Sequence, residues 1–201
     1  MEASPIWEKN METKQDIRKR VLEKRNCLNK QEWEEKSDKI FEKVITHPIF
    51  LHAEEIYCYI DFRNEVATRK LIETCWNLNK AVAVPKIDGS NMEFYYISSW
   101  DDLSSGHWGI LEPDQGMLAE GESVCVIMPG AVFDKKRNRI GYGKGFYDRY
   151  LGKYPWIHTI GVAYEKQLCE EFLSDEFDVP MDKVITEERE VVINEKFGNV
   201  M

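Results

Sequence analysis

The chain lacks the cysteine patterns of secreted and zinc-binding proteins, and it lacks long apolar runs. Its 5 cysteines are odd in number, scattered and free of any C-x-x-C pair, which argues against a disulfide framework and against a zinc site. No segment approaches membrane-spanning length, and the N-terminus has no basic region followed by an apolar run. We therefore expect reduced, mostly buried thiols, no membrane partner and a cytoplasmic location, with residues 1–12 as a poorly ordered extension.

An excess of positive charge is also missing. The 27 lysines and arginines stand against 36 aspartates and glutamates, giving a net charge of -9, which argues against nucleic acid as the main partner. No repeat, low-complexity tract or linker-like stretch divides the 201 residues. We therefore expect one domain over residues 1–201, a monomer that acts on small molecules, in which any anion site is locally basic.

The residues from Val124 to Leu151 have the order of a strand, a glycine-rich loop and a helix. Residues 124–128 are an apolar run typical of a strand that is buried on both faces. Pro129-Gly130 ends it, a charged turn begins at Asp134, and an amphipathic aromatic segment starts at Phe146. The loop therefore follows the carboxyl end of a strand and precedes a helix N-terminus, where α/β proteins bind ligands.

The glycine loop, Gly141–Gly145, has glycine at every second position. Glycine keeps side chains out of the way, so successive backbone N–H groups can converge on phosphate oxygens. Three cations flank these glycines: Arg139, Lys144 and Arg149. Asp148 is the nearby acid, and a carboxylate beside bound phosphates is a natural Mg²⁺ ligand. The loop matches neither the dinucleotide fingerprint nor the P-loop, so spacing alone leaves phosphate binding and a purely structural turn both open.

Residues 128–151, MPGAVFDKKRNRIGYGKGFYDRYL, strongly resemble the signature of the 5-formyltetrahydrofolate cyclo-ligase family, also called methenyltetrahydrofolate synthetase. Members carry Pro-Gly, Phe-Asp, Arg-Leu-Gly-x-Gly-x-Gly and Tyr-Asp-x-Tyr-Leu at these spacings. One departure is Arg137, which stands where members usually have a glycine after Phe-Asp. We expect Asn138 to take the left-handed conformation instead.

The alternation of strands and helices predicts a three-layer α/β/α fold with a mostly parallel sheet. The resemblance points to the fold shared with sugar-phosphate isomerases and CoA transferases. It implies ATP- and Mg²⁺-dependent cyclisation of 5-formyltetrahydrofolate to 5,10-methenyltetrahydrofolate, with release of ADP and phosphate. A non-catalytic nucleotide- or folate-binding relative is the alternative. A sugar-phosphate isomerase of the same fold would need no ATP, and the cations described next favour an ATP user.

The resemblance also implies which residues bind ATP and the metal ion. The residues expected to contact ATP are Lys14, Arg18, Arg139, Gly141, Tyr142, Gly143, Lys144, Gly145, Phe146, Tyr147 and Arg149. Of these, Lys144, Tyr147 and Arg149 are assigned to catalysis. Asp148 and Asp178 are the expected Mg²⁺ ligands. Taken by themselves, Lys14 and Arg18 are more simply explained as a solvated face of a helix, and Asp178 as part of an ordinary acidic turn.

For the folate, the resemblance assigns Glu65, Trp108 and Tyr147. Glu65 follows a predicted strand and precedes a helix, and its carboxylate is expected to accept two parallel hydrogen bonds from the pterin ring. The alternative is that Glu65 simply stabilises the positive helix N-terminus. Trp108 lies in a glycine-rich loop and is expected to stack on a ring, although a core plug is the commoner role of such a tryptophan. His107 and Lys86 receive no role.

Capping signals and apolar periodicity predict the remaining elements. Helices are expected to open after Thr13 and after Asn29, the second helix serving only for packing. Other expected elements are strands at 55–60, 81–84, 92–97, 158–163, 183–186 and 191–193, and helices at 66–78 and within 164–173. Pro85-Lys86 should end the strand at 81–84, and a hairpin should turn at Asp88-Gly89.

Overall fold

The computed structural model describes residues 12–106 and 109–193. Its main sheet has 6 strands in the order β11-β9-β6-β1-β2-β3. Their bounds are Lys183–Ile185 for β11, His158–Val162 for β9, Val124–Met128 for β6, Glu55–Cys58 for β1, Ala81–Asp88 for β2 and Asn91–Ile97 for β3. All neighbours pair in parallel except β2 and β3, which form the antiparallel hairpin. The predicted α/β fold with a mostly parallel sheet is confirmed.

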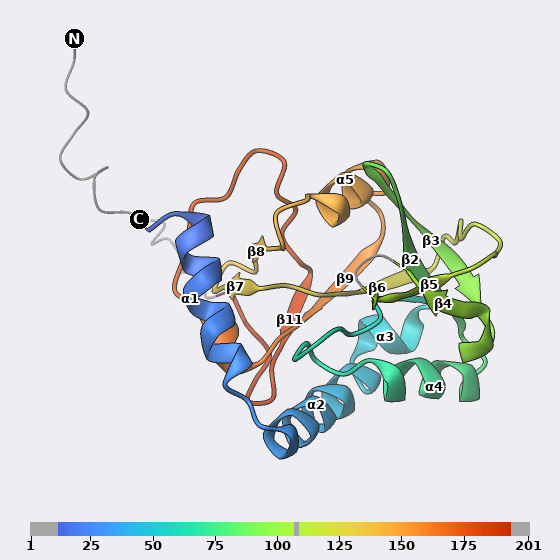
Figure 1. Cartoon of the computed structure of the whole chain (residues 1–201), viewed down its shortest axis with the longest axis horizontal. Coiled ribbons are helices and arrows are strands. Elements are labelled where there is room, and N and C mark those ends of the chain that lie inside the picture. Colours follow the sequence, from blue (N-terminus) through green and yellow to red (C-terminus); the bar gives the residue numbers. More distant parts are fainter. Residues whose placement is uncertain (1–11, 107–108, 194–201) are drawn as a thin grey trace, which may run out of the picture.

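Helices lie against both faces of this sheet (Figure 1). The helices are α1 (Lys14–Asn26), α2 (Lys30–Ile45), α3 (Pro48–His52), α4 (Arg69–Asn77) and α5 (Phe146–Lys153). The helix starts follow the predicted caps, because the Thr13 hydroxyl accepts a hydrogen bond from the Asp16 N–H and Asn29 forms a capping box with Glu32. Figure 1 shows α2, α3 and α4 on one side of the sheet and α5 on the other.

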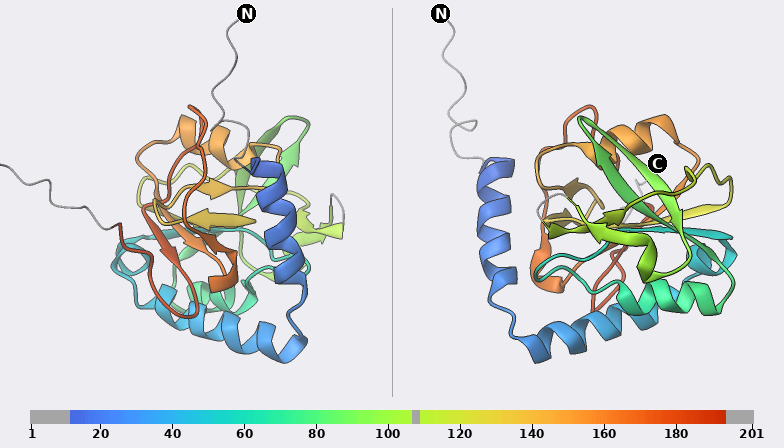
Figure 2. Two further views of the ribbon diagram at one scale, coloured as in Figure 1. Left: turned by 90° about the vertical axis from the view of Figure 1, so that its left-hand side faces the viewer. Right: turned by 45° about the vertical axis from the view of Figure 1, so that its right-hand side comes forward.

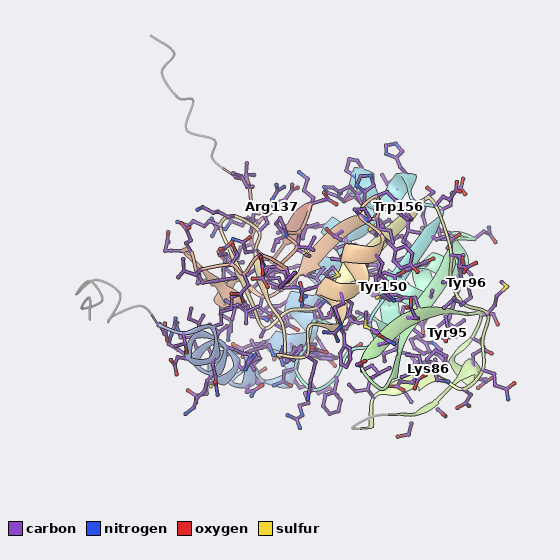
Figure 3. The ribbon with its side chains drawn as sticks, turned by 90° about the horizontal axis from the view of Figure 1, so that it is seen from above. Lys86, Tyr95, Tyr96, Arg137, Tyr150 and Trp156 are labelled. Atoms are coloured by element: carbon purple, nitrogen blue, oxygen red, sulfur yellow. The ribbon has the colours of Figure 1, made fainter. Side chains whose placement is uncertain are left out.

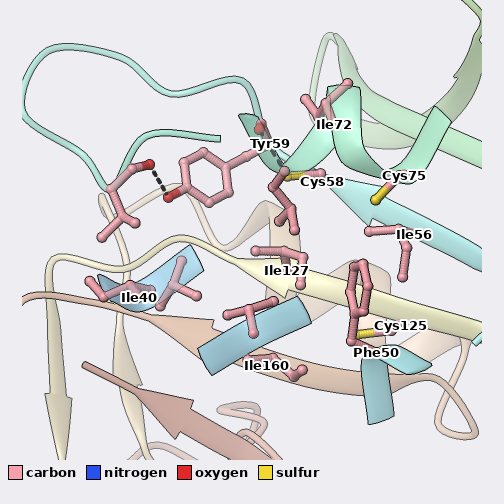
Figure 4. Close-up of a cluster of buried hydrophobic side chains, with 14 of the residues drawn as sticks. Ile40, Phe50, Ile56, Cys58, Tyr59, Ile72, Cys75, Cys125, Ile127 and Ile160 are labelled. Carbon is pink, nitrogen blue, oxygen red and sulfur yellow. Dashed lines mark hydrogen bonds between the residues drawn. The ribbon is translucent and has the colours of Figure 1, made fainter. Parts of the chain in front are cut away.

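The alternation of side chains along β6 produces two hydrophobic clusters. Cys125 and Ile127 point to the cluster that packs with α2, α3 and α4, whereas Val124, Val126 and Met128 point to the cluster that packs with α5. Every residue of β6 is buried. The first cluster is drawn in Figure 4, where Ile127 lies among Cys58, Ile160 and their neighbours. This strand is therefore the centre of the core. The glycine loop does not follow it directly, because two short strands at 132–134 and 139–140 lie between them.

A second, 3-stranded sheet was not predicted from the sequence. It joins β7 (Val132–Asp134), β8 (Arg139–Ile140) and β10 (Leu168–Cys169). The turn between β7 and β8 is held by the buried Asp134 carboxylate, which accepts hydrogen bonds from the backbone N–H groups of Lys136 and Asn138 at 2.8 Å each. The expected left-handed Asn138 was wrong, since Arg137 itself takes that conformation, with φ of 66°. Asn138 instead donates its side-chain amide to Asp134.

Three other expectations were corrected. Strand β2 continues through Pro85 and Lys86 to Asp88, because β3 pairs with it along its whole length. Pairing of Ile185 with Glu190 is an isolated bridge, so no strand forms at 191–193. The expected helix within 164–173 is a single 3-10 turn, Glu165–Gln167. Figure 3 shows Lys86 beside Tyr95 and well apart from Arg137.

Smaller features complete the described chain. A 3-10 turn at Trp100–Asp102 leads into the short antiparallel pair β4 (Leu103–Ser105) and β5 (Leu111–Pro113). All of the cysteines are free, and Cys58, Cys75 and Cys125 are buried, as expected. Over residues 12–106 and 109–193, no helix combines the length and the apolar character that a bilayer crossing requires.

The central position of β6 predicts the effect of shortening Ile127, which is 1% exposed. We expect Ile127→Ala to lower the free energy of unfolding by about 2–5 kcal/mol, because it removes buried methyl groups and leaves a cavity. Urea unfolding followed by circular dichroism measures this change. The control is Leu51→Ala on α3, where the side chain is 54% exposed and the loss should be much smaller. Equal losses in the two variants would contradict the assignment of β6 as the core strand.

Candidate functional site

A cavity of about 850 Å³ lies at the carboxyl edge of the main sheet. Its wall includes Ile60 just after β1, Pro85 on β2 and Pro129 just after β6. Further wall residues come from α1 and from the glycine loop. Parallel strands bring the loops that follow them to one edge, which explains why these segments meet. The volume is in the range of small-molecule sites.

Helix α1 supplies one basic wall of the cavity. Figure 2 shows this helix running along one flank of the molecule. Lys14, Arg18 and Arg25 line the cavity together, since spacings of 4 and 7 residues return to the same helix face. The Arg18 Nη1 donates to the Gly141 carbonyl oxygen at 3.4 Å. Sequence reasoning missed Arg25, although its spacing from Arg18 could have revealed it.

The glycine loop forms the facing wall. Gly143 has φ of 95° and Gly145 φ of 63°, conformations that side chains rarely adopt. A Cβ atom on Gly143 would also lie 3.0 Å from the Arg18 Nη1 atom. Glycine is therefore required at 143 both for the backbone and for the close approach of Arg18. The start of α5 lines the same cavity with Phe146, Tyr147 and Asp148.

The two carboxylates predicted to bind metal are both ion-paired with predicted ATP-binding cations. Arg139 Nη2 donates to both carboxylate oxygens of Asp148 at 2.9 Å. The Lys14 ammonium contacts Asp178 and also Asp175, the latter at 2.6 Å. Burial lowers the pKa of Lys14, but these two carboxylates outweigh it and hold the pKa above its ordinary value. Within the described ranges, no three His, Cys, Asp or Glu side chains form a ready-made metal cluster.

Glu65 lies in the wall of the cavity and is held at several points. One carboxylate oxygen, Oε2, accepts the Phe62 N–H at 3.0 Å, and the other, Oε1, accepts the Tyr142 hydroxyl. Its backbone carbonyl accepts the indole N–H of Trp33 at 2.7 Å. Burial raises the pKa of Glu65 above its ordinary value, whereas the Tyr142 hydroxyl and Arg25 act in the opposite direction. Helix α2, which carries Trp33, therefore positions a site residue and does more than pack.

Two predicted site residues are not found in the cavity wall: Arg149 lies elsewhere, and Trp108 is outside the described residues. Arg149 is not among the residues that line the cavity: its guanidinium donates to the backbone carbonyls of Lys144 at 2.9 Å and Ser90 at 2.8 Å. It thereby ties the glycine loop to the β2–β3 hairpin. Trp108 and the neighbouring His107 fall outside the described residues, so the folate contact of Trp108 stays a prediction. Lys86 donates to the Asp114 carbonyl and is likewise not part of the cavity wall.

Comparison with known proteins agrees with this geometry. A sequence model of the 5-formyltetrahydrofolate cyclo-ligase family matches residues 10–187. The 5-formyltetrahydrofolate cyclo-ligase of Mycoplasma genitalium is 31% identical over 182 residues, covering 87% of this chain and 98% of that protein. The mouse 5-formyltetrahydrofolate cyclo-ligase is 26% identical over 190 residues, covering 87% and 94%. The solved structure of 5,10-methenyltetrahydrofolate synthetase from Aquifex aeolicus superimposes with a TM-score of 0.81 at 31% identity, covering 92% and 95%.

The fold and the site define an α/β protein with a ligand-sized cavity between a basic helix and a glycine loop. The comparisons identify it further: the chain belongs to the 5-formyltetrahydrofolate cyclo-ligase family, and it is an enzyme of that family. Its family and its structural neighbours indicate 5,10-methenyltetrahydrofolate synthetase activity.

The pairing of Arg139 with Asp148 predicts a structural cost for removing the carboxylate. Arg139 is 5% exposed, and its Nε has no hydrogen-bond partner among the described residues. We expect Asp148→Ala to lower the free energy of unfolding by about 2 kcal/mol or more, because a buried cation loses its counter-charge. Glu93→Ala, which breaks the more exposed pair with Lys153, should cost less than about 1 kcal/mol. Similar small losses in both variants, measured by urea unfolding, would contradict this account.

Proposed function

We propose that the chain catalyses ATP- and Mg²⁺-dependent cyclisation of 5-formyltetrahydrofolate to 5,10-methenyltetrahydrofolate, with release of ADP and phosphate. One observation carries the proposal: the carboxylate of Glu65 and the glycine loop line the same cavity. A pterin held by Glu65 and phosphates held by the loop would therefore share one space. The proposal extends to folate and ATP as small-molecule substrates and to a cytoplasmic monomer.

The residues around the loop fit the polyphosphate of ATP. Lys14, Arg18 and Lys144 bring positive charge to the cavity from α1 and from the glycine loop. Backbone N–H groups of a glycine loop at a helix N-terminus are well suited to phosphate oxygens. In this proposal Lys144 and the loop hold the β- and γ-phosphates, and Lys14 and Arg18 hold them from α1. Arg149 acts by fixing the loop through the Lys144 carbonyl.

The residues present also fit Mg²⁺. This ion commonly uses one or two protein carboxylates together with substrate phosphates and water, and Asp148 and Asp178 both line the cavity. On binding the metal, each aspartate would give up part of its contact with its present cation. When bound, Mg²⁺ would neutralise charge on the phosphates. Arg139 and Lys14, released in part from their aspartates, would then be available to the same phosphates.

The reaction needs activation because an N-formyl amide is a poor electrophile. The formyl oxygen attacks the γ-phosphorus, ADP leaves, and an iminium phosphate forms. N10 then adds to the formyl carbon, its proton is lost and phosphate departs. The protein's contribution is alignment and charge stabilisation rather than covalent chemistry. Glu65 would orient the pterin, while Tyr147 and Phe146 would form the wall between the two substrates.

Near-ultraviolet absorbance of the product tests the proposal. Purified protein is mixed with 5-formyltetrahydrofolate, ATP and Mg²⁺, and each component is left out in turn. Methenyltetrahydrofolate should form only when all three are present. If no product forms while ATP still raises the melting temperature, the chain is a non-catalytic nucleotide-binding relative and the proposal is wrong.

The proposed metal role predicts a loss of turnover in Asp148→Asn. The amide keeps the size of the side chain but removes the charge that attracts Mg²⁺ and Arg139. We expect turnover to fall at least about tenfold, which corresponds to roughly 1.4 kcal/mol of transition-state stabilisation. Turnover is measured at saturating Mg²⁺ and ATP, with Glu93→Gln as a surface control and urea unfolding as a check that the variant is folded. Wild-type turnover would remove Asp148 from the site.

A further inference from the structure

A chain of hydrogen bonds leads from Arg25 on α1 through Tyr142 of the glycine loop to Glu65. Arg25 Nη1 donates to the Tyr142 hydroxyl oxygen at 2.7 Å, and the hydroxyl contacts Glu65 Oε1. A guanidinium can only donate hydrogen bonds, so the hydroxyl must use its single proton toward Glu65. Arg25 therefore fixes the direction of both hydrogen bonds: Arg25 donates to Tyr142, and Tyr142 donates to Glu65.

Glu65 has no freedom to turn away from this contact. The Phe62 N–H holds its Oε2 atom at 3.0 Å. Its backbone carbonyl accepts hydrogen bonds from Trp33 at 2.7 Å and from the Tyr164 hydroxyl at 3.2 Å. The segment that carries the carboxylate is thus tied to α2 and to the loop after β9, while Tyr142 reaches it from the opposite wall of the cavity.

We infer that Tyr142 and Arg25 are positioning residues whose hydrogen bonds hold the Glu65 carboxylate in its ionised form for the pterin ring. This inference rests on the proposed function, in which Glu65 anchors the pterin. It adds two residues to folate recognition, neither of which contacts the pterin in this account. It also gives Tyr142 a role different from the ATP contact that the family resemblance implies.

The geometry leaves room for the ligand. An ionised carboxylate offers about four lone-pair sites, and one hydrogen bond on each oxygen uses only half of them. The two remaining sites, one per oxygen, suit the paired N–H donors of an aminopyrimidine edge. Tyr142 therefore supports the carboxylate without taking the place of the substrate.

The charges around Glu65 explain why it needs this support. Burial and the neighbouring Asp61 raise its pKa, whereas Tyr142, Arg25 and the Phe62 N–H lower it. Burial, and after it the charge of Glu65, raise the pKa of Tyr59 and of Tyr147. A protonated Glu65 would lose acceptor capacity on one oxygen and would bind the pterin edge poorly.

Arg25 is unusual because its charged side chain is buried and only partly hydrogen-bonded. It is 5% exposed, its Nε atom has no partner among the described residues, and the Tyr142 ring lies 5.9 Å from its Cζ atom. Burying a guanidinium costs desolvation free energy, which a single hydroxyl partner does not offset. A role in ionising the nearby carboxylate accounts for its place in the cavity wall.

The test is the pH dependence of the KM for 5-formyltetrahydrofolate in Tyr142→Phe. Without the hydroxyl the pKa of Glu65 rises further, so a larger fraction is protonated at low pH. We expect the KM to increase by up to about tenfold at the acidic end of the profile, the size of one hydrogen bond to a charged group, and to approach the wild-type value as the pH is raised. The kcat at saturating folate and ATP should change less than about twofold.

Tyr95→Phe is the matched control, because Tyr95 lies on β3 and is not among the residues that line the cavity. It should keep the wild-type KM at every pH. Arg25→Met should shift the KM of the enzyme in the same direction as Tyr142→Phe and with the same pH dependence. Tyr142 is 47% exposed, so its loss of a hydroxyl should leave the fold intact.

Several results would overturn the inference. An unchanged KM, a KM change that is independent of pH, or tighter folate binding in Tyr142→Phe would each do so, the last by making Tyr142 a competitor of the substrate. Glu65→Gln separates this failure from failure of the proposed function. If Glu65→Gln binds folate normally, Glu65 does not anchor the pterin and that part of the proposed function is wrong. If Glu65→Gln loses folate binding while Tyr142→Phe behaves as the wild type, the proposed function stands and only the inference about Tyr142 and Arg25 is wrong.

Discussion

The parallel pairing of β1 with β6 is the constraint on which the site depends. Glu55 pairs with Val124 and Cys58 with Ile127, so both strands end at the same edge of the sheet. The segment after β1 carries Glu65, and the segment after β6 leads to the glycine loop. Because β6 is buried on both faces by two hydrophobic clusters, this register cannot slip without exposing the core. The core therefore determines that the two recognition segments meet.

Positive charge is concentrated at the cavity where these two segments meet. The chain as a whole has a net charge of -9, yet several cations line the cavity, from the buried Arg25 and Arg139 to the exposed Arg63 and Lys144. Those on its wall are Lys14, Arg18, Arg25, Arg63, Arg139 and Lys144. Two ion pairs, Arg139 with Asp148 and Lys14 with Asp178, partner cations of the cavity wall. Under the proposed function these pairs would be exchanged for phosphate and metal, and the buried charges would stay partnered throughout.

The sequence predicted the parts of this structure that depend on local patterns. Helix caps at Thr13 and Asn29, the buried strand β6 and the hairpin at Gly89 all follow from short-range rules, and they are confirmed. The small sheet depends on the pairing of β7 with β10, which is distant in the sequence. The length of β2 and the left-handed Arg137 depend on nearby partners, β3 and the Asp134 carboxylate, whose pairing and hydrogen bonds periodicity does not reveal. In the site, Lys14 and Arg18 were found by spacing and resemblance. Arg25 was missed although it has the helical spacing of Lys14 and Arg18. The Trp33 contact to Glu65 was missed because it depends on how α2 packs against a segment 32 residues further along the chain.

A structure of the protein with 5-formyltetrahydrofolate and a non-hydrolysable ATP analogue tests the central claim most directly, namely that one cavity joins the carboxylate after β1 to the glycine loop after β6. The account predicts the pterin ring on the Glu65 carboxylate, the phosphates on the backbone of Gly141–Gly145, and the formyl oxygen facing the γ-phosphate between them. Either ligand bound outside this cavity, or a pterin ring without contact to Glu65, would contradict it.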